Sequence, residues 1–416
     1  MDNTPFLAQQ MRHANATELA QALADCRART LALFACYRHA LGDGLGVPQT
    51  GDLNPPLWEL GHIGWFQEFW LTRNPQRSAG TAADPHAPRA PSLLVGADAL
   101  FNSSTVPHTA RWTLQLLNVD ATLAYLHATL AQTLDLLACS SSSDDALYFF
   151  RLALLHEDMH SEAWVQMAQS LGIAVEQDGC RSAHGSAASA APAAGHLPEI
   201  QLSACTWPLG SPNTGFVFDN ELGSHSVALT AFAIDARPVS LAQFLAFVDD
   251  GGYRQARYWS AAGWQWLSAL AAAHPKHLRR SHNDSTTGWQ QERFGQWQAA
   301  DLHAPATHLT YFEAQAWCQW AGRRLPSETE WECAALTCPQ TLQWGQVWEW
   351  TASTFMPYPG FAPHPYRDYS APWFGTHQVL RGASWATSAR VKHPRYRNFF
   401  EPQRNDVLAG FRTCAG

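Results

Sequence analysis

The chain has 416 residues, enough for two domains, and 46% of them are hydrophobic, as in an ordinary globular protein. Its net charge is -8, with 35 acidic and 27 basic residues and no run of Lys or Arg, which excludes nucleic acid as the expected partner. The opening residues lack the basic and apolar regions of a secretory signal, and no uninterrupted apolar stretch reaches the roughly 18 residues of a membrane span. The nine Cys are scattered without a CxxC pair. We therefore expect a cytoplasmic protein with reduced thiols and small-molecule partners.

The first 181 residues carry the pattern of a helical domain. Four segments have apolar residues at three- and four-residue spacing: 17–41, 57–71, 120–138, and one that ends at Leu171 before Gly172. Polar residues suited to N-capping precede three of them: Asn54, Asp120, and Asp144 or Asp145. The connection 73–112 is too polar and Pro-rich for a fifth helix. The pattern predicts an up-and-down four-helix bundle.

The residue composition and pattern of the chain change after residue 181. Residues 182–197 read SAHGSAASAAPAAGHL, which is small, polar and without period, and we predict a linker over 182–198. Residues 199–416 are predicted to form an α+β domain with much irregular structure. Its expected elements are β-prone runs such as 216–218 and 379–381, helices at 241–249 and 311–322, and an irregular segment at 353–376.

Histidines form the sharpest local feature of the helical half. His156 and His160 are four residues apart, so both imidazoles lie on one helix face and can reach one metal ion. His62 stands in the middle of another predicted helix, among apolar and aromatic residues, where a buried imidazole needs a partner. A histidine on an apolar helix face is more often a hydrogen-bonded core residue than a metal ligand. Both interpretations are open at this point.

The same residues also spell H-E-x-x-H, the helix signature of zinc peptidases, in which Glu157 would be the general base. The extended form of that signature fails, because Ala163 stands where its Gly should be and Gln166 where its third His should be. Glu176 lies beyond Gly172, past the end of the helix. A zinc metallopeptidase is therefore one alternative, and a non-catalytic, lectin-like binding protein is another.

Several long motifs extend the case beyond single residues. The helical half contains NPPLWELGHIGWFQEFW and LLHEDMHSEAW; the second half contains PVSLAQFLAFVDDGGY, THLTYFEAQAWCQWAGRRLPSETEWECAA, GQVWEWTASTFMPYPGF and VLRGASWATSARVKHPRYRNFFEPQRNDVLAGFRTC. Through these motifs nearly the whole chain resembles the ergothioneine-biosynthesis sulfoxide synthases and the related selenoneine synthases. The resemblance implies a DinB-like four-helix bundle followed by a C-type-lectin-like domain similar to that of formylglycine-generating enzymes.

The same resemblance implies a non-heme iron(II) enzyme with iron held by His62, His156 and His160. Three neutral imidazoles leave positions open for O₂ and for a thiolate or selenolate. The implied reaction joins the chalcogen of a donor to the carbon between the two ring nitrogens of hercynine (trimethyl-histidine). Glu162 is then expected to support the ligands or pack the helix rather than bind the metal. Formylglycine-generating activity is rejected, because the reactive Cys pair of those enzymes is missing from the matching segment.

Substrate contacts are implied by the match of YRNFFEPQR to the family's substrate-binding stretch. Asn398 is the expected contact to hercynine and Phe399 a wall beside its trimethylammonium. Relatives that use γ-glutamylcysteine have an acidic residue where this chain has Phe400, so that donor is disfavoured.

Two further roles concern the contacts to the sulfur or selenium donor and the group that supplies a proton. Arg404 matches the arginine of the family's substrate-binding stretch, and Arg111 is a second candidate contact for an anionic or hydroxylated donor. The loop around residues 103–104 lacks the tyrosine that some cysteine-using relatives employ as an acid, which leaves Tyr358 as the candidate catalytic acid. We expect a selenosugar or a small thiol as donor.

Overall fold

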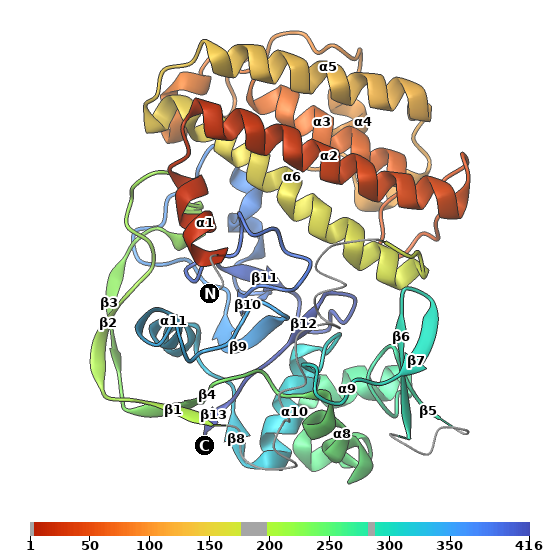
Figure 1. Cartoon of the computed structure of the whole chain (residues 1–416), viewed down its shortest axis with the longest axis vertical. Helices are drawn as coiled ribbons and strands as arrows, with labels where there is room; N and C mark the ends of the chain where they lie inside the picture. The colour runs from red at the N-terminus through yellow and green to blue at the C-terminus, as the bar shows by residue number, and fades with distance from the viewer. Residues whose placement is uncertain (1–3, 176–197, 282–287) are drawn as a thin grey trace.

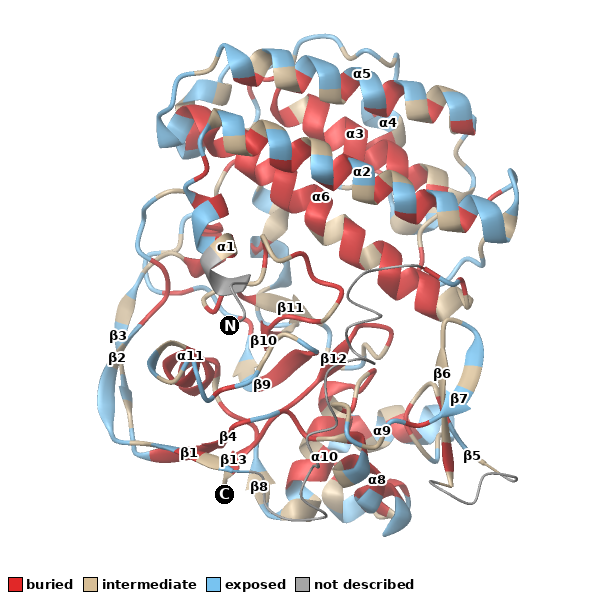
Figure 2. Cartoon of the chain, in the orientation of Figure 1, coloured by how far each residue is buried: buried red, intermediate tan, exposed pale blue. Residues whose placement is uncertain are grey.

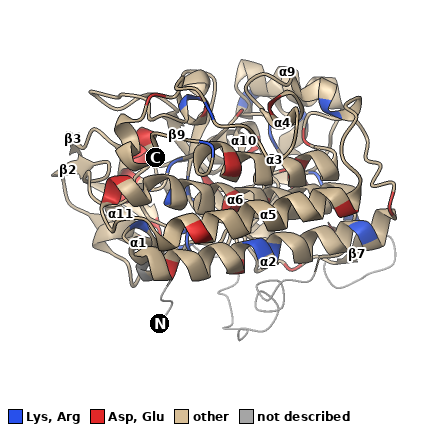
Figure 3. Ribbon diagram, turned by 90° about the horizontal axis from the view of Figure 1, so that it is seen from above, with Lys and Arg blue, Asp and Glu red and all other residues tan. Residues whose placement is uncertain are grey.

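The structure is a computed structural model that describes residues 4–175, 198–281 and 288–416. A layer of long helices covers one end of the molecule, and a domain of short strands and helices forms the other (Figure 1). The predicted linker lies outside the described residues except for its last residue. None of the helices in the described part is long and apolar enough to cross a membrane. Basic and acidic residues are interspersed along the ribbon in the view of Figure 3.

The predicted helical bundle is confirmed. Its four helices are α2 (Ala16–Leu41), α3 (Pro56–Trp70), α5 (Val119–Ala138) and α6 (Asp144–Leu171), and the short α1 (Thr4–Arg12) precedes them. The nine-residue α1 was not predicted. Buried residues run almost without interruption along α3 and α6, whereas α2 and α5 expose one face each (Figure 2). α3 and α6 are therefore the central helices of the bundle.

The caps of these helices differ from the predicted ones. The α5 and α6 N-caps are Asn118 and Ser143, whose side chains accept backbone N–H groups, in place of Asp120 and Asp144 or Asp145. The N-cap residue of α3 is Pro55, which has no side-chain cap to offer, and the predicted cap Asn54 is hydrogen-bonded to Glu59. Gly172 ends α6 in the left-handed conformation, as expected.

The long connection between α3 and α5 has no long helix but contains short helical segments. It contains η1 (Arg77–Ala82), the five-residue α4 (Ala97–Phe101) and η2 (His108–Trp112). α4 packs closely on α3, because a Cβ on Gly61 would come within 2.3 Å of the Phe101 ring. A side chain at position 61 would therefore push Phe101 away from the neighbouring His62.

The second domain is α+β, as predicted. One four-stranded sheet has the order β1 (Glu199–Leu202), β4 (Phe232–Asp235), β13 (Cys414–Ala415) and β8 (Arg323–Arg324). A second four-stranded sheet has the order β11 (Asn398–Phe400), β10 (Gln378–Gly382), β9 (Trp348–Thr354) and β12 (Ala409–Gly410). Two smaller sheets consist of the pair β2 (Cys205–Leu209) and β3 (His225–Leu229), and of the three strands β5 (Leu278–Arg280), β6 (Trp289–Arg293) and β7 (Gln296–Ala299). Its longer helices are α8 (Leu241–Asp249), α9 (Ala261–Leu270), α10 (Tyr311–Ala321) and α11 (Glu328–Thr337). Only β12 and β9 run parallel within the β9–β12 sheet.

Most predicted elements of this domain are found. The helices at 241–249 and 311–322 and the strand at 379–381 match α8, α10 and β10. The strand predicted at 216–218 is wrong: Phe216 donates its N–H to the Arg12 carbonyl of α1 rather than to a strand. The segment 353–376 is mostly irregular, as predicted, with η6 (Arg367–Tyr369) and η7 (Ala371–Trp373) inside it.

The two domains meet along α6. The buried Glu162 carboxylate accepts hydrogen bonds from Trp348 Nε1, Ser384 Oγ and Thr387 Oγ1 at 2.5–2.8 Å. Asp158, one turn earlier, forms an ion pair with Arg390 at 2.7 Å. Glu162 is thus a docking residue, in line with the expectation that it packs the helix.

Candidate metal centre and substrate cavity

Three histidines converge where α3 and α6 face each other. The potential ligand atoms of His62, His156 and His160 all lie within 4.8 Å of one another. His156 and His160 are one helical turn apart, and their Nε2 atoms are separated by 3.2 Å. Within the described residues, no other group of three His, Cys, Asp or Glu side chains is arranged to hold a metal ion.

Hydrogen bonds fix two of the three rings. His62 Nδ1 lies 2.8 Å from the Phe101 carbonyl oxygen, and His160 Nδ1 is hydrogen-bonded to the buried Glu59 carboxylate. A ring that uses Nδ1–H in this way presents Nε2 as an acceptor, which is the usual arrangement of a metal-binding histidine. The third ring, His156, stacks on Phe66 with a centroid separation of 3.5 Å.

Burial keeps the imidazoles of His62 and His156 in the form that binds metals. It lowers the pKa of His62 to about 3 and the pKa of His156 well below its ordinary value, and the neighbouring His160 acts in the same direction. Neutral imidazoles that converge in a water-poor setting are a suitable donor set for iron(II) or zinc. The residues present therefore fit the cofactor implied by the family resemblance.

A cavity of about 400 Å³ opens beside the histidines. His156 and His160 form one side, and β11 with the segment that follows it forms another. The remaining lining includes Asp52, Asn54, Met159, Trp348, Tyr366, Tyr369, Tyr396 and Asp406. Both domains contribute, so the cavity exists only when they are docked.

The predicted substrate residues of the second domain come together here. Asn398, Phe399, Phe400 and Arg404 all line the cavity. The Asn398 Oδ1 accepts the Phe399 backbone N–H at 2.9 Å, which turns the amide NH₂ away from its own backbone. Arg404 forms an ion pair with Asp406, and its guanidinium lies 5.3 Å from the centre of the Phe400 ring.

Two predicted residues lie elsewhere. Tyr358 does not line the cavity; its hydroxyl donates to Glu328 at 2.9 Å, and the Arg397 guanidinium lies over its ring. Arg111 does not line it either, because its side chain ends at Asn54 and on the Trp58 ring. The structure therefore does not bring Tyr358 or Arg111 to the position expected of a substrate contact.

Sequence reasoning missed two tyrosines of the cavity, Tyr366 and Tyr369, whereas Tyr396 belongs to the predicted substrate-binding stretch. Tyr366 lies with its ring 6.2 Å from that of His156 and 4.9 Å from that of Phe66, and burial raises its pKa. Tyr369 and Tyr396 share a hydrogen bond of 3.0 Å between their hydroxyl groups. Tyr366 and Tyr369 come from an irregular segment without periodicity, so only the aromatic density of that segment could have drawn attention to them.

Glu157 faces away from the histidines. Its carboxylate forms a buried ion pair with Arg27 at 2.8 Å and accepts a hydrogen bond from Thr30. A zinc peptidase needs this carboxylate beside the metal-bound water. The structure therefore leaves the zinc-peptidase alternative without its general base.

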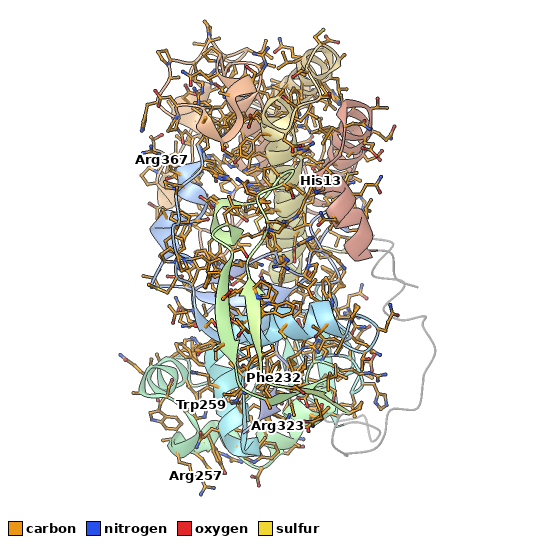
Figure 4. All side chains as sticks on the ribbon, turned by 90° about the vertical axis from the view of Figure 1, so that its left-hand side faces the viewer. His13, Phe232, Arg257, Trp259, Arg323 and Arg367 are labelled. Atoms are coloured by element: carbon orange, nitrogen blue, oxygen red, sulfur yellow. The ribbon has the colours of Figure 1, made fainter. Side chains whose placement is uncertain are left out.

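A second cavity, of about 580 Å³, lies in the α+β domain. Its lining includes Arg257, Trp259 and Arg323, which Figure 4 places at the end of the molecule remote from the bundle. Arg323 and Arg324 in this lining are already paired with carboxylates. The cavity beside the histidines is thus the one that combines a possible metal centre with substrate-sized space.

Fold and site together define a class: a helical bundle that carries a three-histidine centre, joined to an α+β domain that walls the cavity. Comparison with known families agrees with this division. Residues 22–162 match the DinB superfamily, and residues 199–344 and 339–415 match the sulfatase-modifying factor enzyme 1-like domain.

Curated relatives span both parts. The chain is 31% identical to the hercynine oxygenase of Mycolicibacterium thermoresistibile, over 95% of this chain and 94% of that protein. It is also 31% identical to the hercynine oxygenase of Mycobacterium tuberculosis, over 95% of this chain and 98% of that protein. A formylglycine-generating enzyme of Streptomyces coelicolor is 32% identical, but only over 29% of this chain and 41% of that enzyme. The chain belongs to the hercynine oxygenase family.

Proposed function

We propose that this protein is an iron(II)- and O₂-dependent enzyme that joins a sulfur or selenium donor to the imidazole of hercynine. The observation that carries the proposal is the convergence of His62, His156 and His160 beside a cavity whose far wall holds Asn398 and Phe399. The names of the full-length relatives, which are hercynine oxygenases, give the substrate class. His62, His156 and His160 would hold the iron through Nε2, and bound iron would supply the centre where O₂ and the chalcogen meet.

Hercynine would be held by aromatic faces and one amide. Its trimethylammonium has no N–H to donate, so rings such as Phe399 and the cavity tyrosines are suitable partners. The Asn398 NH₂ group is free to donate to a polar atom of hercynine, because its Oδ1 is already satisfied by the Phe399 N–H.

The donor would occupy the side of the cavity near Phe400, Arg404 and Asp52. Phe400 offers no charge to an ammonium group, and the Arg404 charge is already balanced by Asp406. Asp52 is itself within 3.9 Å of Lys276. A cavity whose charges are paired internally suits a selenosugar or a small thiol better than the charged γ-glutamylcysteine.

For the proton donor we propose Tyr366 rather than Tyr358. It lines the cavity beside His156, and a phenol is protonated at neutral pH, as an acid must be.

The test is an anaerobic titration of the iron-loaded protein with hercynine, followed by admission of O₂ in the presence of cysteine, γ-glutamylcysteine or a selenosugar. We expect a hercynine–chalcogen product, identified by mass spectrometry. His62→Ala, His156→Ala and His160→Ala should each lose stoichiometric iron, whereas His127→Ala, an exposed position on α5, should keep it. Asn398→Ala should weaken hercynine binding roughly 5- to 150-fold. Full iron occupancy in all three histidine variants, or no product with any donor, would defeat the proposal.

A further inference from the structure

One guanidinium is connected to two of the three histidines through other side chains. Arg111 Nη1 donates to Asn54 Oδ1 at 2.8 Å, and Asn54 Nδ2 donates to Glu59 Oε2 at 3.0 Å. The other carboxylate oxygen of Glu59 is hydrogen-bonded to His160 Nδ1. The chain of hydrogen bonds thus runs from Arg111 to His160.

A second connection runs through aromatic stacking. The Arg111 guanidinium carbon lies 3.7 Å from the centre of the Trp58 ring. Trp58 in turn stacks on His62, with ring centroids 5.0 Å apart and planes inclined by only 7°. The indole cannot turn freely, because its Nε1 donates to the Leu100 carbonyl at 2.8 Å.

The electrostatic role of Arg111 follows from the burial of Glu59. That side chain is 1% exposed, and a buried carboxylate is costly unless cations and donors surround it. Arg111, acting through Asn54, supplies the positive charge on the side opposite His160. An ionised Glu59 then accepts the Nδ1–H of His160 and leaves its Nε2 free for a metal.

We propose that Arg111 is a positioning residue of the metal centre and not a contact to the substrate. It holds Glu59 and Trp58 in place, and through them the ring planes of His160 and His62. Partners of this kind typically change metal affinity about 10- to 100-fold when they are removed. The inference rests on the proposed function only in that the three histidines bind a metal.

The experiment measures Co(II) binding, because cobalt reports ligand geometry through its visible absorption. Full-length Arg111→Ala should bind Co(II) about 10- to 100-fold more weakly than wild type in competition with a chelator, with an altered spectrum. Arg111→Gln, which keeps a donor for Asn54 but loses the charge, should fall between the two. The KM for the donor should stay within about twofold of wild type in both variants, while kcat falls.

Arg89→Ala is the matched control. That guanidinium also lies over aromatic rings of α3, at 4.6 Å from Phe69, but its hydrogen bonds go only to nearby backbone carbonyls. Its Co(II) affinity and spectrum should equal those of wild type. If Arg111→Ala does not fold, Asn54→Ala cuts the same chain at its next link and is measured in the same way.

Wild-type Co(II) affinity and spectrum in both the Arg111 and Asn54 variants would overturn the inference. A raised donor KM with unchanged metal affinity would overturn it as well, in favour of a substrate contact. A wild-type protein that binds neither Co(II) nor Fe(II) would instead defeat the proposed function on which the inference rests.

Discussion

Replacing Glu157 by Gln is expected to reduce the stability of the protein but not its turnover. The carboxylate forms a two-point ion pair with Arg27, at 2.8 and 3.1 Å, and accepts the Thr30 hydroxyl at 2.8 Å. Both charged side chains are nearly inaccessible, at 2% and 3% exposure. Removing one partner of a buried pair typically costs about 3–5 kcal/mol, because the other charge remains buried without compensation.

The local surroundings place Glu157→Gln at the lower end of that range. Arg27 also donates to the Leu126 carbonyl and to Gln67, so its guanidinium keeps two acceptors when the carboxylate is lost. We therefore expect a loss of about 3 kcal/mol in the free energy of unfolding, a substantial share of the roughly 5–15 kcal/mol of a typical domain. The double variant Arg27→Met/Glu157→Leu should recover only part of it, because an apolar pair leaves no buried charge but removes the donor of the Leu126 carbonyl and of Gln67.

The assay combines urea unfolding followed by circular dichroism, metal analysis, and turnover normalised to iron content. Turnover per iron should stay within about twofold of wild type, because the Glu157 carboxylate faces Arg27 and does not line the cavity. A variant that is as stable as wild type and keeps its metal, yet has lost its activity, would refute this reasoning. Such a result would put Glu157 back beside the metal, as in a zinc peptidase.

Three further predictions concern the domain contact, the donor and pH. Glu162→Gln removes a charge that accepts hydrogen bonds from three donors, and it should lower the free energy of unfolding in urea by about 2 kcal/mol. The iron content should stay at one equivalent. An unchanged urea midpoint would contradict the docking role of Glu162. In competition kinetics, the wild type should prefer a small thiol or selenosugar over γ-glutamylcysteine by at least roughly tenfold, about 1.4 kcal/mol. Phe400→Asp should reduce this preference. A wild-type preference for γ-glutamylcysteine would exclude the placement of the donor beside Phe400. Burial lowers the pKa of His364 from 6.5 to about 4, so the unfolded chain takes up the extra proton between these values. This contribution to stability is complete above pH 6.5 and is lost as the pH falls, by about 1–2 kcal/mol at pH 5. His364→Gln should therefore make the urea midpoint depend less on pH. If the midpoints of wild type and variant change with pH in the same way, His364 is not the group responsible.

Long helices were predictable from the sequence, and of the short elements only some, such as α8 and β10, were predicted. The four main helices show their apolar periodicity over many turns, which is why their bounds agree closely with the structure. α9 and α11 have only ten residues each, and their main signals are the N-caps Ser260 and Ser327. For α11 the signal was readable, because Ser327 and Glu330 form the S-x-x-E capping box that precedes the buried Trp331.

The closeness of His156 and His160 was predictable because both lie on one helix, so their separation follows from helical geometry, whereas His62 joined them only through the family resemblance. The tyrosine wall depends instead on contacts between residues far apart in the chain. Asp219 accepts hydrogen bonds from the Ser370 hydroxyl and the His364 N–H, and these bonds hold the segment that presents Tyr366 and Tyr369. No local pattern in the sequence indicates these contacts, so the sequence did not single out Tyr366 or Tyr369.

The geometry of α6 explains how a site shared between two domains stays in register. His156 and His160 face α3, whereas Asp158 and Glu162 each stand two residues further along and bind the second domain. A shift of two residues turns the side chain by about 200°, so one helix presents ligands on one face and docking carboxylates on the other. Trp348 lines the cavity and also donates to Glu162, so the docking contacts of α6 place part of the cavity wall relative to the histidines. Contacts of α6 with the second domain therefore help to define the geometry of the candidate site.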